Sequence, residues 1–224
     1  MRLPLKENIF TATNWGILCD FDGTISSVDV IDVLLEQFAD STWQDIEKEW
    51  KSGRIGSLEC LSKQVQLLDV SRTQLNQCLD SIEIDRHFPS FVVEMEAKGY
   101  NITIISDGLD YAIKRILSRY DLGHIPVLAN ILQQKGSRHW QLAFPNSKMD
   151  CEIQSGHCKC ASLKRIHDGM NSARSLLIGD GTSDFCVARK VDFVLAKKRL
   201  IQHCISHNLP HYPIKSFSDA LAVL

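Results

Sequence analysis

Two short apolar runs in this chain each stop at an aspartate that opens a glycine-containing turn. The first run, WGILCD, covers residues 15–20, and the second, SLLIGD, covers residues 175–180. A third run, NITIIS at 101–106, stops at a serine. Such runs are typical of buried parallel strands, whose carboxyl ends meet at one edge of a sheet where ligands bind. We therefore expect Asp20, Ser106 and Asp180 to lie close together.

The rest of the chain predicts an α/β fold with a helical insert. Residues 30–82 carry amphipathic patterns of helical period and no strand-like run. Beyond them strand and helix alternate, which indicates a parallel sheet covered on both faces. We expect strands at 126–132 and 192–196, a hairpin around 138–144, an irregular segment at 145–157, and helices near 90–98, 109–119, 159–168, 183–190 and 197–207.

Composition excludes several classes of protein. With 224 residues, 44% of them hydrophobic, the chain is long enough for one sizeable core, or for one core and a small accessory domain. The 25 basic residues do not exceed the 27 acidic ones, so nucleic acid is not the expected partner. No run approaches the ~20 apolar residues of a spanning helix, and residues 1–16 contain no apolar segment of the length expected for a signal peptide. We expect a cytoplasmic protein without a membrane partner, whose cysteines are mostly reduced and buried.

The two aspartate turns have the residues needed for phosphate chemistry. Asp20 and Asp22 stand two residues apart at a strand end, so a nucleophile and a proton donor could be neighbours. The second turn, GDGTSD at 179–184, adds Asp180 and Asp184, whose oxygens suit a hard divalent cation. Either turn alone could simply hold capping aspartates. The occurrence of both in this order of strands favours a catalytic site.

The ordered motifs DFDGT, IISDG, a lysine and GDGTSD resemble those of the haloacid dehalogenase superfamily phosphatases. The helical insert resembles the small cap of the phosphoserine phosphatase-like subgroup. This resemblance implies a Rossmann-like parallel sheet core with a small helical cap inserted after the first strand. The core would comprise residues 1–29 and 84–224, and the cap residues 30–83.

The resemblance also implies roles for the acidic residues. Asp20 would be the nucleophile that forms an aspartyl-phosphate, and Asp22 would protonate the leaving oxygen and later activate water. Mg²⁺ would be the cofactor, held by the Asp20 carboxylate, the Asp22 carbonyl and Asp180. Asp184 would bind or support the ion.

The phosphoryl group would be held by two further motifs. Ser106 would donate a hydrogen bond to it, assisted by main-chain N–H groups near Asp107 and Gly108, although Ser106 could also be a simple helix cap. Of two candidate lysines, the resemblance favours Lys159, at the start of a helix, over Lys164, which we expect in solvent.

Substrate preference depends on the cap. Asp29 stands where phosphoserine phosphatases carry a glutamate that binds the substrate amine, and Gln64 where they carry an arginine for the carboxylate. The acid at Asp29, the segment HWQLAFPNS, the cysteine-bearing insert and the tail are similar to the methionine-salvage phosphatase family, which acts on a phosphorylated methylthio-ketopentene. The insert, CEIQSGHCKC, has fewer cysteines than that family's, and SDG stands in place of SGG. Asp29 and Gln64 could equally be surface or capping groups.

Several alternatives therefore stay open. The substrate, a small phosphorylated metabolite, could be phosphoserine, phosphocholine or phosphoethanolamine, and a catalytically silent phosphometabolite-binding protein would keep the same fold. The protein could be a monomer or a homodimer. A last cluster comprises Cys151, His157, Cys158 and Cys160, which could bind zinc or could be reduced loop residues, and their spacing favours the second interpretation.

Overall fold

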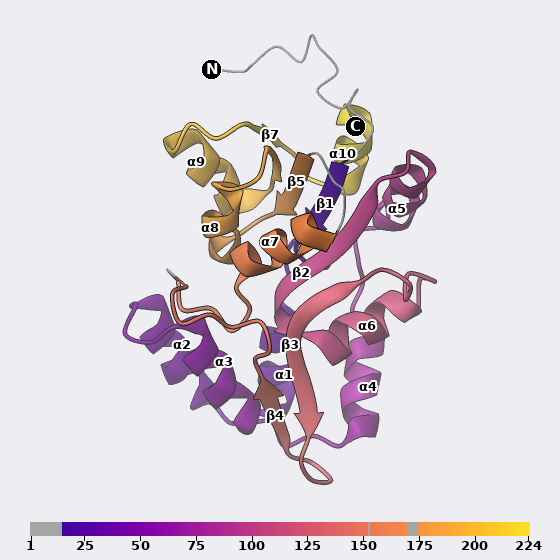
Figure 1. Cartoon of the computed structure of the whole chain (residues 1–224). Helices are drawn as coiled ribbons and strands as arrows, with labels where there is room; N and C mark the ends of the chain where they lie inside the picture. Colours follow the sequence, from indigo (N-terminus) through magenta and orange to yellow (C-terminus); the bar gives the residue numbers. More distant parts are fainter. Residues whose placement is uncertain (1–14, 152, 170–173) are drawn as a thin grey trace.

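The computed structural model describes residues 15–151, 153–169 and 174–224, and in them a seven-stranded sheet has helices on both faces (Figure 1). The strands are parallel except β4, which pairs antiparallel with β3. Their order across the sheet is β4-β3-β2-β1-β5-β6-β7. The strands span Trp15–Cys19 (β1), Asn101–Leu109 (β2), Val127–Gln134 (β3), Trp140–Ala143 (β4), Arg174–Gly179 (β5), Phe193–Ala196 (β6) and His211–Pro213 (β7).

The strand order reverses its direction at β1. The chain builds the sheet outward from β1 through β2 and β3 on one side, and through β5, β6 and β7 on the other. In open parallel sheets the crevice at such a reversal, beyond the carboxyl ends of the strands, is where ligands bind. Asp20 and Asp180 directly follow β1 and β5, so the topology places both on this crevice.

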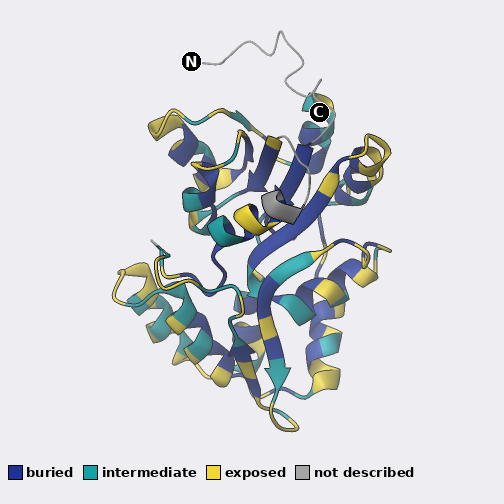
Figure 2. Cartoon of the chain, in the orientation of Figure 1, coloured by how far each residue is buried: buried dark blue, intermediate teal, exposed yellow. Residues whose placement is uncertain are grey.

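Successive side chains of β1 point to opposite faces of the sheet, and each face has its own apolar cluster. Ile17 points into the larger apolar cluster, whereas Leu18 points into the smaller one on the other face. Figure 2 shows the central strands as the most continuously buried part of the molecule. The helices span Val30–Phe38 (α1), Trp43–Lys51 (α2), Ser57–Gln66 (α3), Arg72–Asp80 (α4), Phe88–Ala97 (α5), Asp110–Ser118 (α6), Lys159–Gly169 (α7), Phe185–Ala188 (α8), Lys198–Ser206 (α9) and Phe217–Val223 (α10).

Helices α1–α4 form the helical insert between β1 and β2. They lie beyond the carboxyl ends of the central strands, in the lower part of Figure 1. The β3–β4 hairpin extends from the sheet to meet them: Trp140 donates its indole N–H to the Val70 carbonyl at 2.8 Å. In the other direction, the Val70 N–H donates to the Arg138 carbonyl at 3.2 Å. The insert is therefore packed on the hairpin and stands over the strand ends.

Most of the expected elements are present, with differences at the margins. The structure adds α2, which buries no residue, and the short β7 and α10. The expected hairpin around 138–144 is formed by β3 and β4 together, because residues 135–139 make its turn. The expected helix near 183–190 is a 3₁₀ turn at Thr182–Asp184 followed by the one-turn α8.

The structure bears on some of the expectations drawn from composition. All eight cysteines are free thiols, and five of them are buried. Among the described residues, no helix has both the length and the apolar character that crossing a bilayer would require. The prediction about the amino-terminal segment falls mainly on residues 1–14, which lie outside the described residues.

Candidate active site

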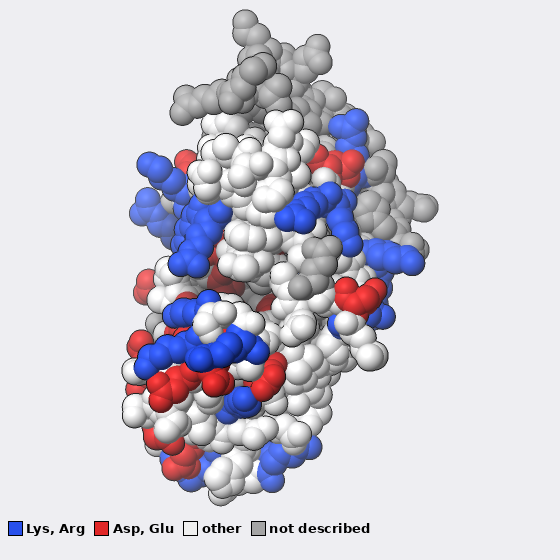
Figure 3. All heavy atoms as spheres, turned by 90° about the vertical axis from the view of Figure 1, so that its left-hand side faces the viewer, with Lys and Arg blue, Asp and Glu red and all other residues white. Residues whose placement is uncertain are grey.

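A pocket of about 480 Å³ lies between the strand ends and the helical insert. Residues after β1, β2 and β5 line one wall, and residues of α1, α2 and α3 line the other. Figure 3 shows this recess from the side, with acidic atoms visible in its depth. The three polar strand ends expected to converge, Asp20, Ser106 and Asp180, all line it.

Asp20 stands at the centre of the site, at the end of β1. Its side chain is almost fully buried, and its Oδ1 accepts hydrogen bonds from the Phe21 N–H at 2.8 Å and from the Lys159 ammonium at 2.7 Å. Burial raises its pKa well above the ordinary value, and the nearby Asp184 charge adds to this, while Lys159 opposes the rise. The carboxylate is thus held in one orientation by two donors on the same oxygen.

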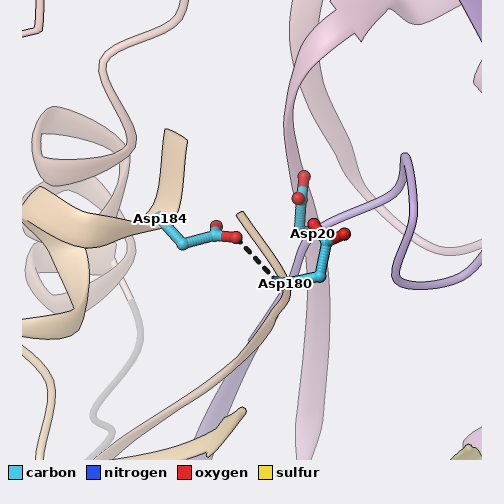
Figure 4. Close-up of side chains that lie close together, drawn as sticks. All are labelled: Asp20, Asp180 and Asp184. Carbon is cyan, nitrogen blue, oxygen red and sulfur yellow. Dashed lines mark hydrogen bonds between the residues drawn. The ribbon is translucent and has the colours of Figure 1, made fainter. Parts of the chain in front are cut away.

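Asp180 and Asp184 complete an acidic cluster with Asp20. Each of the three offers an oxygen within 4.8 Å of the others, and they are the only such group of potential metal ligands in the described part of the chain. Figure 4 shows Asp184 reaching back to the main chain of Asp180, whose N–H it accepts at 3.0 Å. An all-oxygen set of mutually repelling carboxylates fits a hard divalent cation such as Mg²⁺.

Asp22 faces the same pocket from the turn after β1. Its Oδ1 accepts the Val30 N–H at 3.0 Å, and its Oδ2 accepts the Ser106 hydroxyl at 3.3 Å. Burial raises the pKa of Asp22 from 3.8 to about 6, against the hydrogen bonds from Val30 and Ser106 and the charge of Lys159. A carboxyl group with a pKa near 6 can both give and take a proton close to neutral pH.

Lys159 is the first residue of α7, and its side chain is buried. The ammonium contacts Oδ1 of Asp20 and Oδ1 of Asp184, each at 2.7 Å, and the Ser183 hydroxyl at 3.0 Å. Burial alone would lower its pKa, but the charges of Asp184 and Asp20 raise it above the ordinary lysine value. Lys164 is exposed, as expected. Lys159 is therefore a buried positive charge shared by Asp20 and Asp184.

The turn at Ser106–Gly108 approaches Asp22 closely. The register of β2 against β3 shifts between Ile105 and Leu109, which marks a bulge in this part of β2. A Cβ atom on Gly108 would lie 2.6 Å from Oδ2 of Asp22, so a larger residue here would displace the Asp22 side chain from its present position. The Gly108 N–H, expected to face a phosphoryl group, donates instead to the Ser106 hydroxyl at 2.9 Å.

The two expected substrate-binding residues of the insert both line the pocket, and both are already engaged. Asp29 caps α1 by accepting the Ile31 N–H at 3.0 Å, which is the capping alternative. Gln64 is buried and donates to Glu47 at 3.0 Å. Neither contact excludes substrate binding, but each holds its side chain in a defined position when no substrate is bound.

The pocket also includes residues that the sequence did not single out. Glu47, Trp50 and Lys51 reach it from α2, and Lys198 and Arg199 from the start of α9. Lys198 pairs with Asp180 at 3.0 Å. A signal for Lys198 was available, because it closely follows β6 and so lies near the carboxyl edge of the sheet. Among the described residues, the cysteine cluster does not gather as a metal site.

Comparison with known proteins agrees with this geometry. The family model of haloacid dehalogenase-like hydrolases matches residues 17–189, which include Asp20, Ser106, Lys159 and Asp180. The chain is 29% identical over 211 residues to a protein of Brevibacillus brevis, covering 93% of this chain and 94% of that protein. It is 27% identical over 215 residues to one of Geobacillus kaustophilus, covering 93% and 94%. Both relatives are named 2-hydroxy-3-keto-5-methylthiopentenyl-1-phosphate phosphatase.

The fold has similar solved structures. A phosphoserine phosphatase carrying a phospho-aspartyl intermediate analogue superposes with a TM-score of 0.72 at 21% identity, covering 94% of this chain and 98% of that one. A substrate-bound phosphoserine phosphatase complex gives a TM-score of 0.71 at 20% identity, covering 94% and 98%. At these identities the similarity establishes the fold alone.

Proposed function

Because the chain belongs to the haloacid dehalogenase-like hydrolase family, we propose that it hydrolyses 2-hydroxy-3-keto-5-methylthiopentenyl-1-phosphate through a covalent phosphate on Asp20. The protein is a phosphoric monoester hydrolase. The choice of substrate rests on relatives of that name that align over more than nine-tenths of this chain. The observation that carries the mechanism is the Asp20 carboxylate, held by Lys159 beside Asp22 at the pocket floor.

Asp20 is oriented for attack on phosphorus. The Phe21 N–H and the Lys159 ammonium both hold Oδ1, so we assign the attack to Oδ2. The new bond joins Oδ2 to phosphorus while the ester P–O bond breaks. Lys159 offsets negative charge on the carboxylates throughout this exchange.

Asp22 handles the proton in both halves of the reaction. Its protonated form, which a pKa of about 6 keeps partly populated near neutral pH, gives the proton to the departing alcohol oxygen. The resulting carboxylate then takes a proton from the water that attacks phosphorus. Inorganic phosphate leaves, Asp20 is regenerated, and Asp22 is protonated again. Ser106 stays within 3.3 Å of Asp22 and can orient both that carboxyl group and the phosphoryl oxygens.

The acidic cluster would hold Mg²⁺ through Asp20 and Asp180, with the Asp22 carbonyl as a further ligand. Mg²⁺ supplies positive charge that neutralises phosphoryl oxygens facing these carboxylates. Asp184, which accepts the Asp180 N–H and pairs with Lys159, acts in this proposal as a support for both. Residues 30–83 act as a cap that excludes water from the pocket, and residues 1–29 and 84–224 as the core.

A phosphomonoester with a cationic group is a second candidate substrate. The insert wall of the pocket carries Asp29, Asp32 and Glu47 beside the partly exposed ring of Trp50. Carboxylates with an aromatic face favour an ammonium group, as in phosphocholine or phosphoethanolamine. Phosphoserine is less favoured, because Gln64 is neutral and bonded to Glu47, and Lys51 on the same wall is already paired with Glu47 at 3.1 Å.

Phosphate release from a panel of phosphomonoesters tests the proposal. The panel contains the methylthio-ketopentenyl phosphate, phosphocholine, phosphoethanolamine, phosphoserine and sugar phosphates, each with Mg²⁺ or EDTA. We expect Mg²⁺-dependent release, greatest for the methylthio-ketopentenyl phosphate, and its loss in Asp20→Asn. Release that survives this substitution would overturn the assignment of the nucleophile. Binding without release from any compound would favour a catalytically silent binding protein.

A further inference from the structure

The Asp107 carboxylate joins the helical insert to the segment that carries Lys159. The residue lies in the irregular part of β2, between Ser106 and Gly108, and lines the pocket. Its Oδ2 accepts the hydroxyl of Ser57 at 2.5 Å. Its Oδ1 accepts the main-chain N–H of His157 at 2.8 Å. The two oxygens therefore serve two different parts of the chain.

The first of these contacts reaches the insert at the start of α3. Ser57 is the first residue of α3, and the preceding Gly56 provides no side-chain cap. The Ser57 hydroxyl is used instead in the contact with Asp107. A carboxylate at this point also faces the positive end of the helix dipole. Both effects draw the amino end of α3 toward the core.

The second contact holds the chain just ahead of Lys159. His157 is buried, and its ring Nε2 lies 2.7 Å from the Ser162 hydroxyl on α7, so its side chain and its main chain are both anchored. Lys159 follows two residues later and places its ammonium on Asp20. Displacement of the His157 main chain would therefore move the start of α7 and the lysine with it.

Asn130, on the neighbouring strand β3, holds both the main chain and the side chain of Asp107. It is fully buried on β3, and its amide donates to the Asp107 carbonyl at 2.6 Å and to Oδ1 at 3.1 Å. The side chain of Asp107 thus makes hydrogen bonds to β3, α3 and the segment before α7 at once. Side chains with this many partners have little freedom to adjust when one partner moves.

The insert and the lysine segment also touch each other directly. The Leu58 N–H donates to the Gln154 carbonyl at 3.2 Å, and a Cβ on Gly56 would lie 2.6 Å from Cβ of Gln154. In Figure 1 the orange loop ahead of α7 runs beside α2 and α3. The amino end of α3, Asp107 and residues 154–157 therefore form one contact zone at the mouth of the site.

We propose that Asp107 is a positioning residue that couples closure of α3 over the pocket to the placement of Lys159. Through Ser57 it holds the insert closed, and through the His157 N–H it holds the lysine segment. The inference rests on the proposed phosphatase function and deepens it. A substrate that draws the insert down would also secure the lysine that offsets charge on Asp20.

Hydrogen exchange of the full chain tests the coupling without any turnover. We expect Asp107→Ala to speed amide exchange about tenfold both at residues 57–61 and at residues 157–161, because the hydrogen bonds to Ser57 and to His157 are both lost. Ser57→Ala should speed exchange most at residues 57–61 and to a smaller extent at residues 157–161, because the freed Asp107 carboxylate holds the His157 N–H less firmly. Ser57→Thr, which keeps the hydroxyl, should restore both segments. Asp45→Ala, which removes an exposed carboxylate of α2, is the matched control and should change neither segment.

Kinetics with p-nitrophenyl phosphate provide the second readout. Ser57→Ala should raise KM about fivefold with little change in kcat, whereas Asp107→Ala should also lower kcat about tenfold. The double variant should equal Asp107→Ala, because Ser57 acts through that carboxylate. Effects of the two substitutions that multiply, or exchange at 157–161 unchanged in Asp107→Ala, would overturn the coupling.

The two readouts separate the possible failures. An inactive wild-type protein would overturn the phosphatase function, while the exchange pattern would still decide whether Asp107 joins the two segments. If Asp107→Ala does not fold, Asp107→Asn takes its place. Its amide has one oxygen acceptor instead of two, so in this geometry it cannot accept from both the His157 N–H and the Ser57 hydroxyl, and unchanged exchange in both segments would overturn the coupling. Ser57→Ala is a small change at a partly exposed site, so its exchange result remains decisive in either case.

Discussion

The Lys159 ammonium lies 2.7 Å from Oδ1 of Asp20, and both side chains are almost completely buried. The same ammonium pairs with Asp184, so a single positive charge serves two buried carboxylates, and for Asp20 it opposes the rise in pKa that burial causes. The contact joins the start of α7 to the end of β1. Electrostatics of the site and packing of the core are therefore linked through one side chain.

Replacing this lysine should damage activity and stability together. In Lys159→Met the two buried carboxylates lose their shared cation, which we expect to lower kcat at least a hundredfold. Breaking a buried ion pair typically costs about 3–5 kcal/mol of unfolding free energy. Phosphate release and urea unfolding measure the two effects. Lys164→Met, an exposed lysine one turn along α7, is the matched control and should resemble the wild type; equal losses in both variants would contradict the assignment.

Mg²⁺ should stabilise the folded protein through the acidic cluster. The folded protein brings the carboxylates of Asp20, Asp180 and Asp184 together, with ion pairs to Lys159 and Lys198 that offset only part of their charge, whereas the unfolded chain does not hold them together. At a Mg²⁺ concentration one hundred times Kd, the gain is about 2.7 kcal/mol. Differential scanning calorimetry with Mg²⁺ and with EDTA should show the higher Tm with Mg²⁺. The shift should be much smaller in Asp180→Asn and unchanged in Asp45→Asn.

Much of the core was predictable from the sequence, because parallel strands leave a plain signal. β1 and β5 are continuous apolar runs that end at aspartates, and the rule that strand ends share one edge brings Asp20 to Asp180. The motif order then distinguished Lys159 from Lys164, a choice that helical periodicity alone could not make.

The insert wall of the pocket was less predictable. Helix α2 buries no residue of its own, so its pattern did not mark it as an element that supplies Glu47 and Trp50 to the site. The side-chain contacts of Asp107 were also beyond sequence reasoning. They join Asp107 to residues fifty positions away in either direction, and Asp107 lies where the register of β2 shifts, which the residue pattern does not reveal.

Acidification should destabilise the protein through His157. Burial, with the charge of Lys159, lowers the pKa of this histidine from 6.5 to about 3. The unfolded chain therefore takes up a proton at its usual pKa while the folded chain does not. This contribution to stability is present above pH 6.5 and is lost as the pH falls from there toward 3.

Urea unfolding at pH 7 and pH 5 measures this effect. The wild type should lose up to about 2 kcal/mol more than His157→Gln between these two pH values. The exposed His124 provides the control, because His124→Gln should follow the wild type. A wild-type protein whose pH dependence matched that of His157→Gln would show that the imidazole accepts a proton in the folded state.

A methyl group at Gly108 should disturb catalysis more than folding. The added Cβ would lie 2.6 Å from Oδ2 of Asp22 and 3.1 Å from the Ser106 hydroxyl, so Asp22 must shift away from its present position. Misplacement of a proton donor by about 1 Å can cost on the order of 100-fold in rate. We expect Gly108→Ala to lower kcat by about that factor and to change the pH dependence of kcat.

Gly123→Ala, whose Cβ would meet no atom within 4 Å, should retain wild-type kcat and Tm. An unchanged kcat in Gly108→Ala would mean that Asp22 is not the proton donor, or that its position is not critical to the reaction.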